Sequence, residues 1–365
     1  QKSNVTPSSV TLYDVLRWQV QLSGTVPITT LKILLRWAKD KSVSARQSSE
    51  YLSELIGDYD NRVRKRGLGI ASVLAGVCVP HTSINAPPLP LSAILKSLPV
   101  ISPRLYSLTN DPESTSDSNS SVTILCRLLR YRDCASGSLV SGLCSSYLCE
   151  RLNSSDSALI FFRESNFHLP PQPSTPVIMI CGGSGIAPFL SFLDKRANYL
   201  RTHGDAELGP AVLYFGSRNP KEYMFREELQ HHLEIGTLSR LAVAFSGSVG
   251  DDPDQHQSEV SQLLQKSCHV NEIIAEQVCN ITDLVNSETD KHLHSLMKQG
   301  AYVYVCGGAG HFGRAVRDSV EQLVQKSLPH EVSEGGDGGG AETGGRNAGV
   351  RLLVNQKRYF EDLAD

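Results

Sequence analysis

The sequence predicts an α/β protein with a β-barrel segment: a helical subdomain, then a partial antiparallel β-barrel, then an open parallel α/β domain. Three observations predict this order. Apolar residues recur with helical spacing near the start, short β-rich segments with polar turns follow, and four continuous apolar runs then alternate with helix-like segments. We therefore expect domains at residues 1–99, 100–173 and 174–365.

Composition and charge narrow the class of protein. Hydrophobic residues make up 40% and charged residues 20% of the 365, as in ordinary globular proteins, and the net charge of −3 gives no reason to expect a nucleic acid partner. The nine cysteines are an odd number without C-x-x-C spacing, which argues against a disulfide framework or a structural zinc and indicates a reducing, cytoplasmic location. We also expect no membrane span, because no apolar run is long enough to cross a bilayer.

The first domain is expected to be helical. Leu31, Leu34, Leu35 and Ala38 follow the i, i+3, i+4, i+7 spacing of an amphipathic helix, and residues 51–59 and 91–98 repeat the pattern. The basic run at residues 62–66 is interpreted as a solvated helix end rather than a docking patch.

The second domain is expected to contain short strands. The segments VTILCRLLRY (122–131), ALIFFRES (158–165) and NFHLP (166–170) are β-rich and are separated by connections rich in Ser, Asp and Asn. Short strands joined by polar turns are typical of an antiparallel barrel or sandwich.

The third domain is expected to hold a parallel sheet. The runs PVIMIC (176–181), AVLYFGS (211–217), LAVAFSG (241–247) and AYVYVCGG (301–308) are apolar throughout, as strands buried on both faces are. The Gly-rich acidic stretch at residues 333–345 is interpreted as a flexible insertion.

A glycine-rich turn follows the first of these runs. In GGSGIAPF (182–189), Gly183, Ser184 and Gly185 stand between a strand and a helix. Glycine lets the backbone approach a ligand closely, and a helix N-terminus offers unpaired N–H groups to a phosphate. The pattern predicts a phosphate cradle, and an unliganded strand-to-helix turn is the alternative.

A second glycine pattern lies at residues 302–313, YVYVCGGAGHFG. Gly308, Gly310 and Gly313 spell G-x-G-x-x-G, but no further strand with an acidic residue follows at the distance that a dinucleotide fingerprint requires. We therefore interpret this spelling as a coincidence at the last strand-to-helix turn of the sheet.

The segment RLYS (104–107) places Arg104, Tyr106 and Ser107 in the alternation of a strand. An Arg can neutralise a phosphate, a Tyr can stack on a flat ring, and a Ser can reach a ring nitrogen. Taken alone, the segment is better interpreted as a plain surface strand.

Together these stretches resemble the C-terminal, FAD- and NADPH-binding module of the diflavin reductase family, which includes the microsomal cytochrome, methionine synthase and nitric oxide synthase reductases. The resemblance covers nearly the whole chain in the family's order, and FHLP, the pair YFGSR and FREEL, and the terminal KRY are most similar to the methionine synthase reductases. It implies a helical connecting subdomain, an FAD-binding barrel and a nucleotide-binding α/β domain.

The resemblance implies flavin-binding roles. Arg104, Tyr106 and Ser107 match the flavin-contacting R-x-Y-S of the family, where the Tyr packs on the isoalloxazine and the Ser lies near its N5. The turn that holds the FAD pyrophosphate in the family is matched by Gly142, Leu143, Cys144 and Ser145.

The resemblance also implies roles towards the nicotinamide nucleotide. Gly183, Ser184 and Gly185 match the turn for the NADPH pyrophosphate, and Arg218 and Ser246 match positions around its adenosine half. The hydride path from nicotinamide to flavin is surrounded in the family by residues that match Ser107, Cys306 and Asp362.

Three positions depart from the family's pattern. Gly247 stands where the family has an Arg for the ribose 2′-phosphate, and the acidic stretch SVGDDPDQ that follows would repel that group, so NADH is an alternative to NADPH. Gly308 replaces an Asp beside the nicotinamide, and Ala364 replaces an aromatic residue that covers the flavin.

The implied function is a flavoprotein oxidoreductase that passes a hydride from NADPH to FAD. The expected partners are an FMN-binding domain, absent from this chain, and a redox acceptor protein such as methionine synthase. We also expect the FAD barrel to stay open, because no sequence before residue 1 supplies its first strands. The alternatives are a cytochrome or sulfite reductase type of diflavin reductase, a single-flavin ferredoxin reductase, and a non-catalytic relative that acts as an interaction module.

Overall fold

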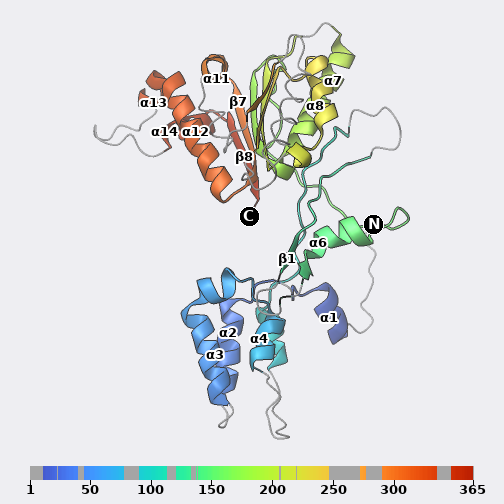
Figure 1. Ribbon diagram of the computed structural model, residues 1–365, viewed down its shortest axis with the longest axis vertical. Coiled ribbons are helices and arrows are strands. Elements are labelled where there is room, and N and C mark those ends of the chain that lie inside the picture. Colours follow the sequence, from blue (N-terminus) through green and yellow to red (C-terminus); the bar gives the residue numbers. More distant parts are fainter. Residues whose placement is uncertain are drawn as a thin grey trace, which may run out of the picture. The chain divides into compact units, whose positions relative to one another are not determined.

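The computed structural model describes residues 11–22, 24–39, 45–77, 90–112, 121–132, 137, 139–204, 207–218, 220–245, 272–276, 290–334 and 347–364. The chain forms two compact units (Figure 1). The first unit comprises Gln1–Leu105 with Cys126–Ala158, and the second comprises Tyr106–Leu125 with Leu159–Asp365. Within the described ranges, no helix has the length and apolar character needed to cross a membrane.

The first unit contains the predicted helices. Its helical elements are α1 (Leu12–Trp18), α2 (Ile28–Lys39), α3 (Ala45–Gly57), the π-helical turn η1 (Asp60–Arg64), α4 (Ile70–Val77) and α5 (Leu91–Ser97). The apolar stripe predicted from the spacing of Leu31, Leu34 and Ala38 is buried, and it packs with Leu52 and Leu55 of α3 in one core. The helical spacing in the sequence therefore identified the buried faces of α2 and α3.

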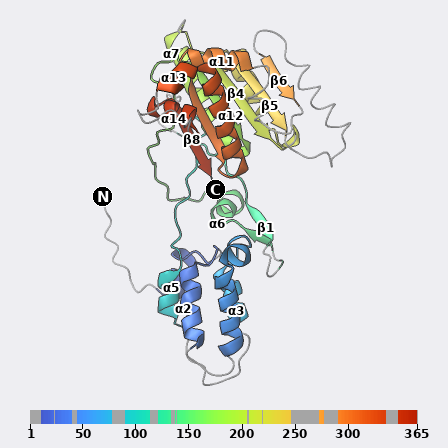
Figure 2. The same cartoon turned by 90° about the vertical axis from the view of Figure 1, so that its left-hand side faces the viewer.

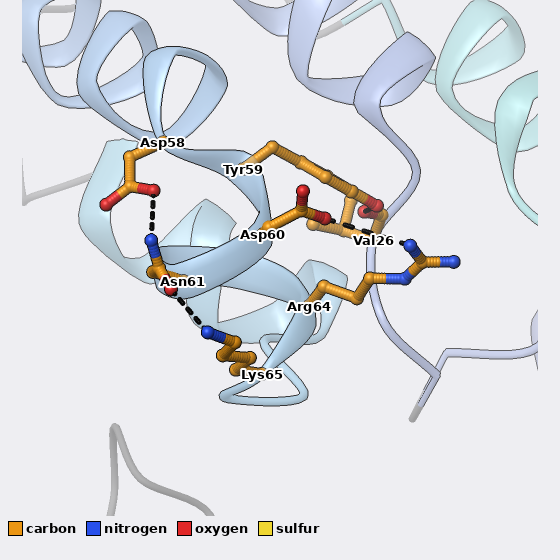
Figure 3. A network of polar contacts seen from close by, with 7 residues as sticks. All are labelled: Val26, Asp58, Tyr59, Asp60, Asn61, Arg64 and Lys65. Atoms are coloured by element: carbon orange, nitrogen blue, oxygen red, sulfur yellow. Dashed lines mark hydrogen bonds and ion pairs between the residues drawn. The ribbon is translucent and has the colours of Figure 1, made fainter. Parts of the chain in front are cut away.

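A polar network anchors the helical turn after α3 (Figure 3). The Tyr59 hydroxyl donates to the carbonyl of Val26 at 2.8 Å, which ties this turn to the segment before α2. Asn61 accepts from Lys65 and donates to Asp58, at 2.8 and 2.7 Å. The basic run also pairs with carboxylates of its own helices, Arg64 with Asp60 and Arg62 with Glu54. The contacts of Asn61, Arg62 and Arg64 are exposed, as expected for a solvated helix end.

The antiparallel barrel is not confirmed. Among its described residues, the first unit contains one antiparallel strand pair, β1 (Arg130–Arg132) with β2 (Leu139–Ser141), and isolated antiparallel bridges at Val20–Val100 and Thr25–Gly69. The short helix α6 (Leu143–Ser146) and the π-helical turn η2 (Tyr147–Arg151) follow β2. In the second unit an isolated bridge joins Leu108 to Ile124. The strands expected at residues 158–170 do not form, although all of these residues are described.

Missing strand partners account for this difference. Leu159, Ile160, Phe161 and Phe162 have the composition of a buried strand, yet each is at least 60% exposed. A strand exists only where a neighbouring backbone accepts and donates its hydrogen bonds, and no segment that the structure describes pairs with these residues. The β-rich composition therefore predicted a conformational preference but not a sheet.

The second unit confirms the open parallel sheet. Its strand order is β6-β5-β4-β3-β7-β8, and every neighbouring pair is parallel. The strands are β3 (Val177–Gly182), β4 (Ala211–Ser217), β5 (Arg240–Phe245), β6 (Glu272–Glu276), β7 (Tyr302–Gly308) and β8 (Tyr359–Ala364). The chain progresses from β3 to one side and returns to place β7 on the other. The sheet therefore has a topological switch point between β3 and β7, where open α/β sheets bind ligands.

Helices cover both faces of this sheet (Figures 1 and 2). One face carries α7 (Ala187–His203), which the 3₁₀ turn η3 (Gly183–Ile186) precedes, and α8 (Arg226–Glu234), which follows the 3₁₀ turn η4 (Pro220–Glu222). The other carries α11 (Asp290–Lys298), α12 (His311–Ser327), α13 (Pro329–Glu334) and α14 (Ala348–Asn355). Because both faces are covered, β3 and β5 are apolar and buried almost throughout, as their continuous runs predicted.

A buried histidine links α8 to the strand that follows it. His232 is 6% exposed, and its Nδ1 pairs with the Thr237 hydroxyl at 2.9 Å. Burial, and to a lesser degree the neighbouring His231, lowers the pKa of His232 to about 4. Its Nε2 lies 3.7 Å from an Asp194 carboxylate oxygen, too far for a hydrogen bond. His232 is therefore neutral in the folded state at neutral pH.

The second unit should lose stability in mild acid through His232. An unfolded histidine titrates near pH 6.5, so between that pH and about 4 the unfolded chain binds a proton that the folded chain does not. The stabilisation is complete above pH 6.5, and we expect the free energy of unfolding to fall by about 2–3 kcal/mol as pH drops to 4. Denaturant titrations across this range should show a flatter pH dependence in His232→Asn. The exposed histidine variant His203→Asn should keep the wild-type dependence, and equal pH dependence in wild type and His232→Asn would contradict the assignment.

Candidate functional site

The predicted site residues of the second unit meet at the carboxyl ends of its parallel strands. In the strand register, Cys306 of β7 lies beside Cys181 of β3 on one side and beside Asp362 of β8 on the other. Because the strands are parallel, their carboxyl ends share one edge of the sheet, and the turns that leave these ends are there too. This edge holds the candidate site.

Cys306 is a buried, neutral thiol. Its side chain lies at the end of β7 with 7% of the residue exposed. Burial raises its pKa to about 12, and the nearby Asp362 carboxylate adds to the increase. A thiol in this state is a poor nucleophile, because the thiolate is the reactive form. Cys306 is therefore suited to packing beside a bound ring rather than to covalent chemistry.

Ser107 and Asp362 are joined directly. The Ser107 hydroxyl donates to Asp362 Oδ2 at 3.1 Å, across 255 residues of sequence. Ser107 is half-buried and Asp362 is exposed. Since Asp362 lies beside Cys306 in the strand register, the structure brings together all three residues that the family resemblance implies for the hydride path.

The glycine turn after β3 lies against Cys306. A side chain on Gly185 would place its Cβ 2.3 Å from the carbonyl oxygen of Cys306, so only glycine fits at this close approach. Gly183 has a φ of +56°, which also favours glycine. The turn forms η3, runs directly into α7, and leaves Gly183 and Ser184 exposed at the start of that helix. These features fit a phosphate group, because the free N–H groups at a helix start bind anions.

Phe312 completes the packing of this edge and was not identified from the sequence. Its ring lies against two glycine backbones: a Cβ added to Gly182 or Gly307 would meet it at 3.3 and 2.6 Å. The available signal was an aromatic residue in the first turn of the helix after a G-G pair, within the stretch that spelled a false fingerprint.

The second predicted phosphate turn lies in the first unit. Gly142 precedes α6 as its N-cap residue, and its N–H donates to the carbonyl of Leu129 at 2.8 Å. The buried Ser145 hydroxyl accepts from the N–H of Leu129 at 3.1 Å, so Ser145 holds the turn in shape. Leu143 is exposed and Cys144 is half-buried. A glycine at a helix start with an exposed neighbour fits a pyrophosphate.

Three further predicted residues lie within the described ranges. Arg104 is exposed, and its guanidinium donates to the carbonyl of Ser102. Tyr106 is half-buried, and Arg218 is exposed directly after β4. Ser246 lies outside the described residues, as do Gly247 and the acidic stretch that follows it.

Two of the departures from the family are neighbours in the sheet. Gly308 and Ala364 are register partners at the ends of β7 and β8, and both are exposed. A Cβ added to Gly308 would meet nothing within 4 Å. Gly308 and Ala364 are therefore two small, adjacent residues at positions where the family has a carboxylate and an aromatic ring. The ends of β7 and β8 thus lack both of these side chains.

Metal chemistry has no candidate ligands in the part of the chain that the structure describes, where no group of three or more His, Cys, Asp or Glu side chains could hold a metal ion. The described site consists instead of a thiol, a carboxylate, a hydroxyl and a glycine turn.

Comparison with protein families gives two matches. Residues 1–147 match the family described as "FAD binding domain", and residues 179–318 match "Oxidoreductase NAD-binding domain". The second range contains the glycine turn after β3 and Cys306, and the first contains Ser107 and the turn at Gly142.

Individual relatives agree with these matches. Methionine synthase reductase of Rattus norvegicus is 25% identical over 378 residues, covering 98% of this chain and 48% of the relative. The Homo sapiens protein of that name is 26% identical with the same coverage. NADPH–cytochrome P450 reductase of Mus musculus is 30% identical over 281 residues, covering 75% of this chain and 35% of the relative. The chain thus spans about half the length of the methionine synthase reductases it matches.

Gly185→Ala should disrupt the turn beside Cys306. The added methyl group would lie 2.3 Å from a backbone oxygen, so the turn or the end of β7 must move. Overpacking of this kind lowers the free energy of unfolding by about 1–3 kcal/mol, and the moved turn should also bind NADPH and NADH more weakly. Denaturant titration and nucleotide binding measure the two effects. Gly57→Ala in α3 is the control, because its methyl group has open space and lies outside the site; equal loss of stability and of nucleotide binding in the two variants would refute the close approach.

Proposed function

We propose that this chain, which belongs to the diflavin reductase family as its FAD- and NAD-binding module, is an NADPH-dependent flavoprotein reductase that passes a hydride to FAD. The observation that carries the proposal is the meeting of Ser107, Cys306 and Asp362 at one edge of the sheet. The three residues come from separate segments of the chain, and only the fold brings them together.

The glycine turns supply the places for the phosphates. Gly183, Ser184 and Gly185 would receive the pyrophosphate of the nicotinamide nucleotide, since their backbone is exposed at the start of α7 and lies directly beside Cys306. The turn from Gly142 to Ser145 would receive the pyrophosphate of FAD, and Arg104 of the same unit would supply a positive charge for it. In the second unit, the family resemblance implies that the Tyr106 ring stacks on the flavin.

When bound, NADPH and FAD supply the hydride donor and acceptor. The chain's own residues would orient the flavin and nicotinamide rings and stabilise the charge that develops on them. The Ser107 hydroxyl donates to Asp362, and its oxygen lone pairs remain available to a donor on the flavin ring. The Asp362 carboxylate offers negative charge where a nicotinamide ring becomes positive on losing a hydride, which lowers the barrier electrostatically. The Cys306 thiol stays protonated and fills the space beside the ring without reacting.

The wider role of the whole protein is also a proposal. The methionine synthase reductases match over nearly the full chain, which supports an FMN-binding domain as the next electron carrier and methionine synthase as the acceptor. The cytochrome P450 reductases match over three quarters of it, so a cytochrome is the alternative acceptor. The odd cysteine count without paired spacing supports a cytoplasmic site of action.

Hydride transfer should depend on Ser107 and Asp362. In the complete protein that carries this chain, anaerobic NADPH should bleach the flavin absorbance in a stopped-flow instrument, and NADH measured in parallel reports the cofactor preference. Ser107→Ala and Asp362→Asn should each slow bleaching by about 10- to 100-fold, because misplaced or uncharged groups lose transition-state stabilisation. Ser102→Ala and Asp318→Asn are matched exposed controls and should bleach at the wild-type rate.

Two outcomes would overturn the proposal. A protein that binds no flavin, or whose flavin neither nucleotide reduces, would favour a non-catalytic interaction module instead. A normal rate in both Ser107→Ala and Asp362→Asn would show that the chemistry takes place away from this edge of the sheet.

A further inference from the structure

We propose that Arg317, Glu361 and Tyr359 form a positioning cluster, named the β8 clamp, that holds Asp362 in place for hydride transfer. The inference rests on the proposed function of Asp362 and adds residues to which neither the sequence comparison nor the family resemblance gives a role. Its basis is that Asp362 stands on an edge strand and has a neighbour, Glu361, that is held firmly from the opposite face.

The position of β8 at the edge of the sheet explains why Asp362 would need additional contacts to hold it in place. Among the described strands, β8 pairs only with β7, so β8 is the edge strand of the described sheet. Asp362 is exposed on this strand, and its carboxylate accepts a hydrogen bond from Ser107. A strand held along one edge can twist or fray at its end, and either movement would carry the Asp362 carboxylate away from Cys306.

Consecutive residues of a strand point to opposite faces of the sheet, which couples Glu361 to Asp362. If the side chain of Glu361 is fixed on the α12 face, rotation of the strand about its axis is prevented, and Asp362 stays directed to the other face. The anchor and the site residue are thus adjacent in sequence while their side chains are on opposite faces.

The contacts of Glu361 provide this fixation. Arg317 of α12 donates from Nε to Glu361 Oε1 at 3.0 Å and from Nη2 to Oε2, so the guanidinium and the carboxylate form a two-point contact. The Tyr359 hydroxyl donates to the same Oε1, and Tyr359 is buried. A two-point Arg–carboxylate contact restricts rotation as well as distance, which a single hydrogen bond does not.

Two further contacts connect the same end of β8 to the turn between β7 and α12 and to the first turn of α12. The N–H of Ala309 donates to the carbonyl of Ala364 at 2.8 Å. Gly313 packs so closely on Leu363 that a Cβ on the glycine would lie 2.8 Å from its Cδ1. Because α12 begins three residues after β7 ends, these contacts join the strand of Cys306, the helix of Arg317 and the strand of Asp362 into one assembly.

The clamp is separable from the stability of the fold. The Arg317 side chain is 43% exposed and that of Glu361 is 18% exposed. When the arginine is removed, Glu361 still accepts a hydrogen bond from the Tyr359 hydroxyl. Removing the arginine should therefore leave a folded chain with a looser β8. The rate of hydride transfer is more sensitive to a small movement of β8 than the stability of the fold is, because a displacement of about 1 Å at a reacting centre can slow a reaction as much as 100-fold.

The first test measures hydride transfer in the complete protein. Arg317→Gln and Glu361→Gln should slow anaerobic flavin bleaching by about 3- to 30-fold, with the dissociation constant for NADPH within about two-fold of wild type. Arg314→Gln is the matched control: it lies on the same helix, donates to the carbonyl of Gly310 and should bleach at the wild-type rate.

A double-variant comparison shows whether Arg317 acts through Asp362. In the Asp362→Asn background, adding Arg317→Gln should change the bleaching rate little, because the group that the clamp positions has already lost its charge. An unchanged rate in Arg317→Gln alone, or the same fold loss with and without Asp362→Asn, would overturn the proposal.

A second readout needs no bound cofactor. Amide hydrogen exchange in residues 359–364 should be faster in Arg317→Gln than in wild type or Arg314→Gln, and the exchanged pair Arg317→Glu with Glu361→Arg should restore protection. Wild-type exchange in Arg317→Gln would contradict the clamp. If Ser107→Ala and Asp362→Asn leave bleaching normal while exchange responds as expected, the proposed function fails and the clamp remains as a contact of the fold.

Discussion

The parallel pairing of β7 with β3 on one side and β8 on the other is the constraint on which the rest of the site depends. It sets Cys181, Cys306 and Asp362 in one row across the sheet. The glycine turn after β3 then lies against the backbone of Cys306 because Gly185 has no side chain. Ser107 reaches the row through Asp362. A shift of β8 by one residue would turn Asp362 to the opposite face of the sheet, away from Ser107 and Cys306.

The sheet could be predicted from the sequence because its inner strands are covered on both faces and carry continuous apolar runs, as in β3 and β5. The strand β8 was not predicted, because an edge strand with Glu361 and Asp362 on its two faces has no apolar run. The barrel strands were predicted and do not form at residues 158–170, since pairing partners decide whether a β-rich segment becomes a strand.

Some of the site residues could also be predicted from the local sequence, and others could not. Gly183 and Gly185 could be identified locally, because a glycine turn between a strand and a helix has a direct physical meaning. Ser107 and Asp362 are exposed or half-buried polar residues 255 positions apart, and no local pattern distinguishes them from surface residues. The family resemblance alone pointed to them. Neither the local sequence pattern nor the family resemblance predicted the contact of Arg317 with Glu361, because that contact depends on how α12 packs on β8, a strand that was not predicted.

The placement of the Asp362 carboxylate beside the Cys306 thiol is tested most directly by alkylation of Cys306 with iodoacetamide. The alkylation rate is compared between the wild-type chain and Asp362→Asn, by peptide mass spectrometry between pH 8 and 10. Asparagine keeps the size of the aspartate side chain and removes its charge, so the comparison isolates the carboxylate, which adds to the effect of burial in raising the pKa of Cys306. We expect faster alkylation of Cys306 in Asp362→Asn, with the exposed Cys149 reacting equally in both proteins. An equal or slower rate at Cys306 would contradict the placement of Asp362 beside the thiol.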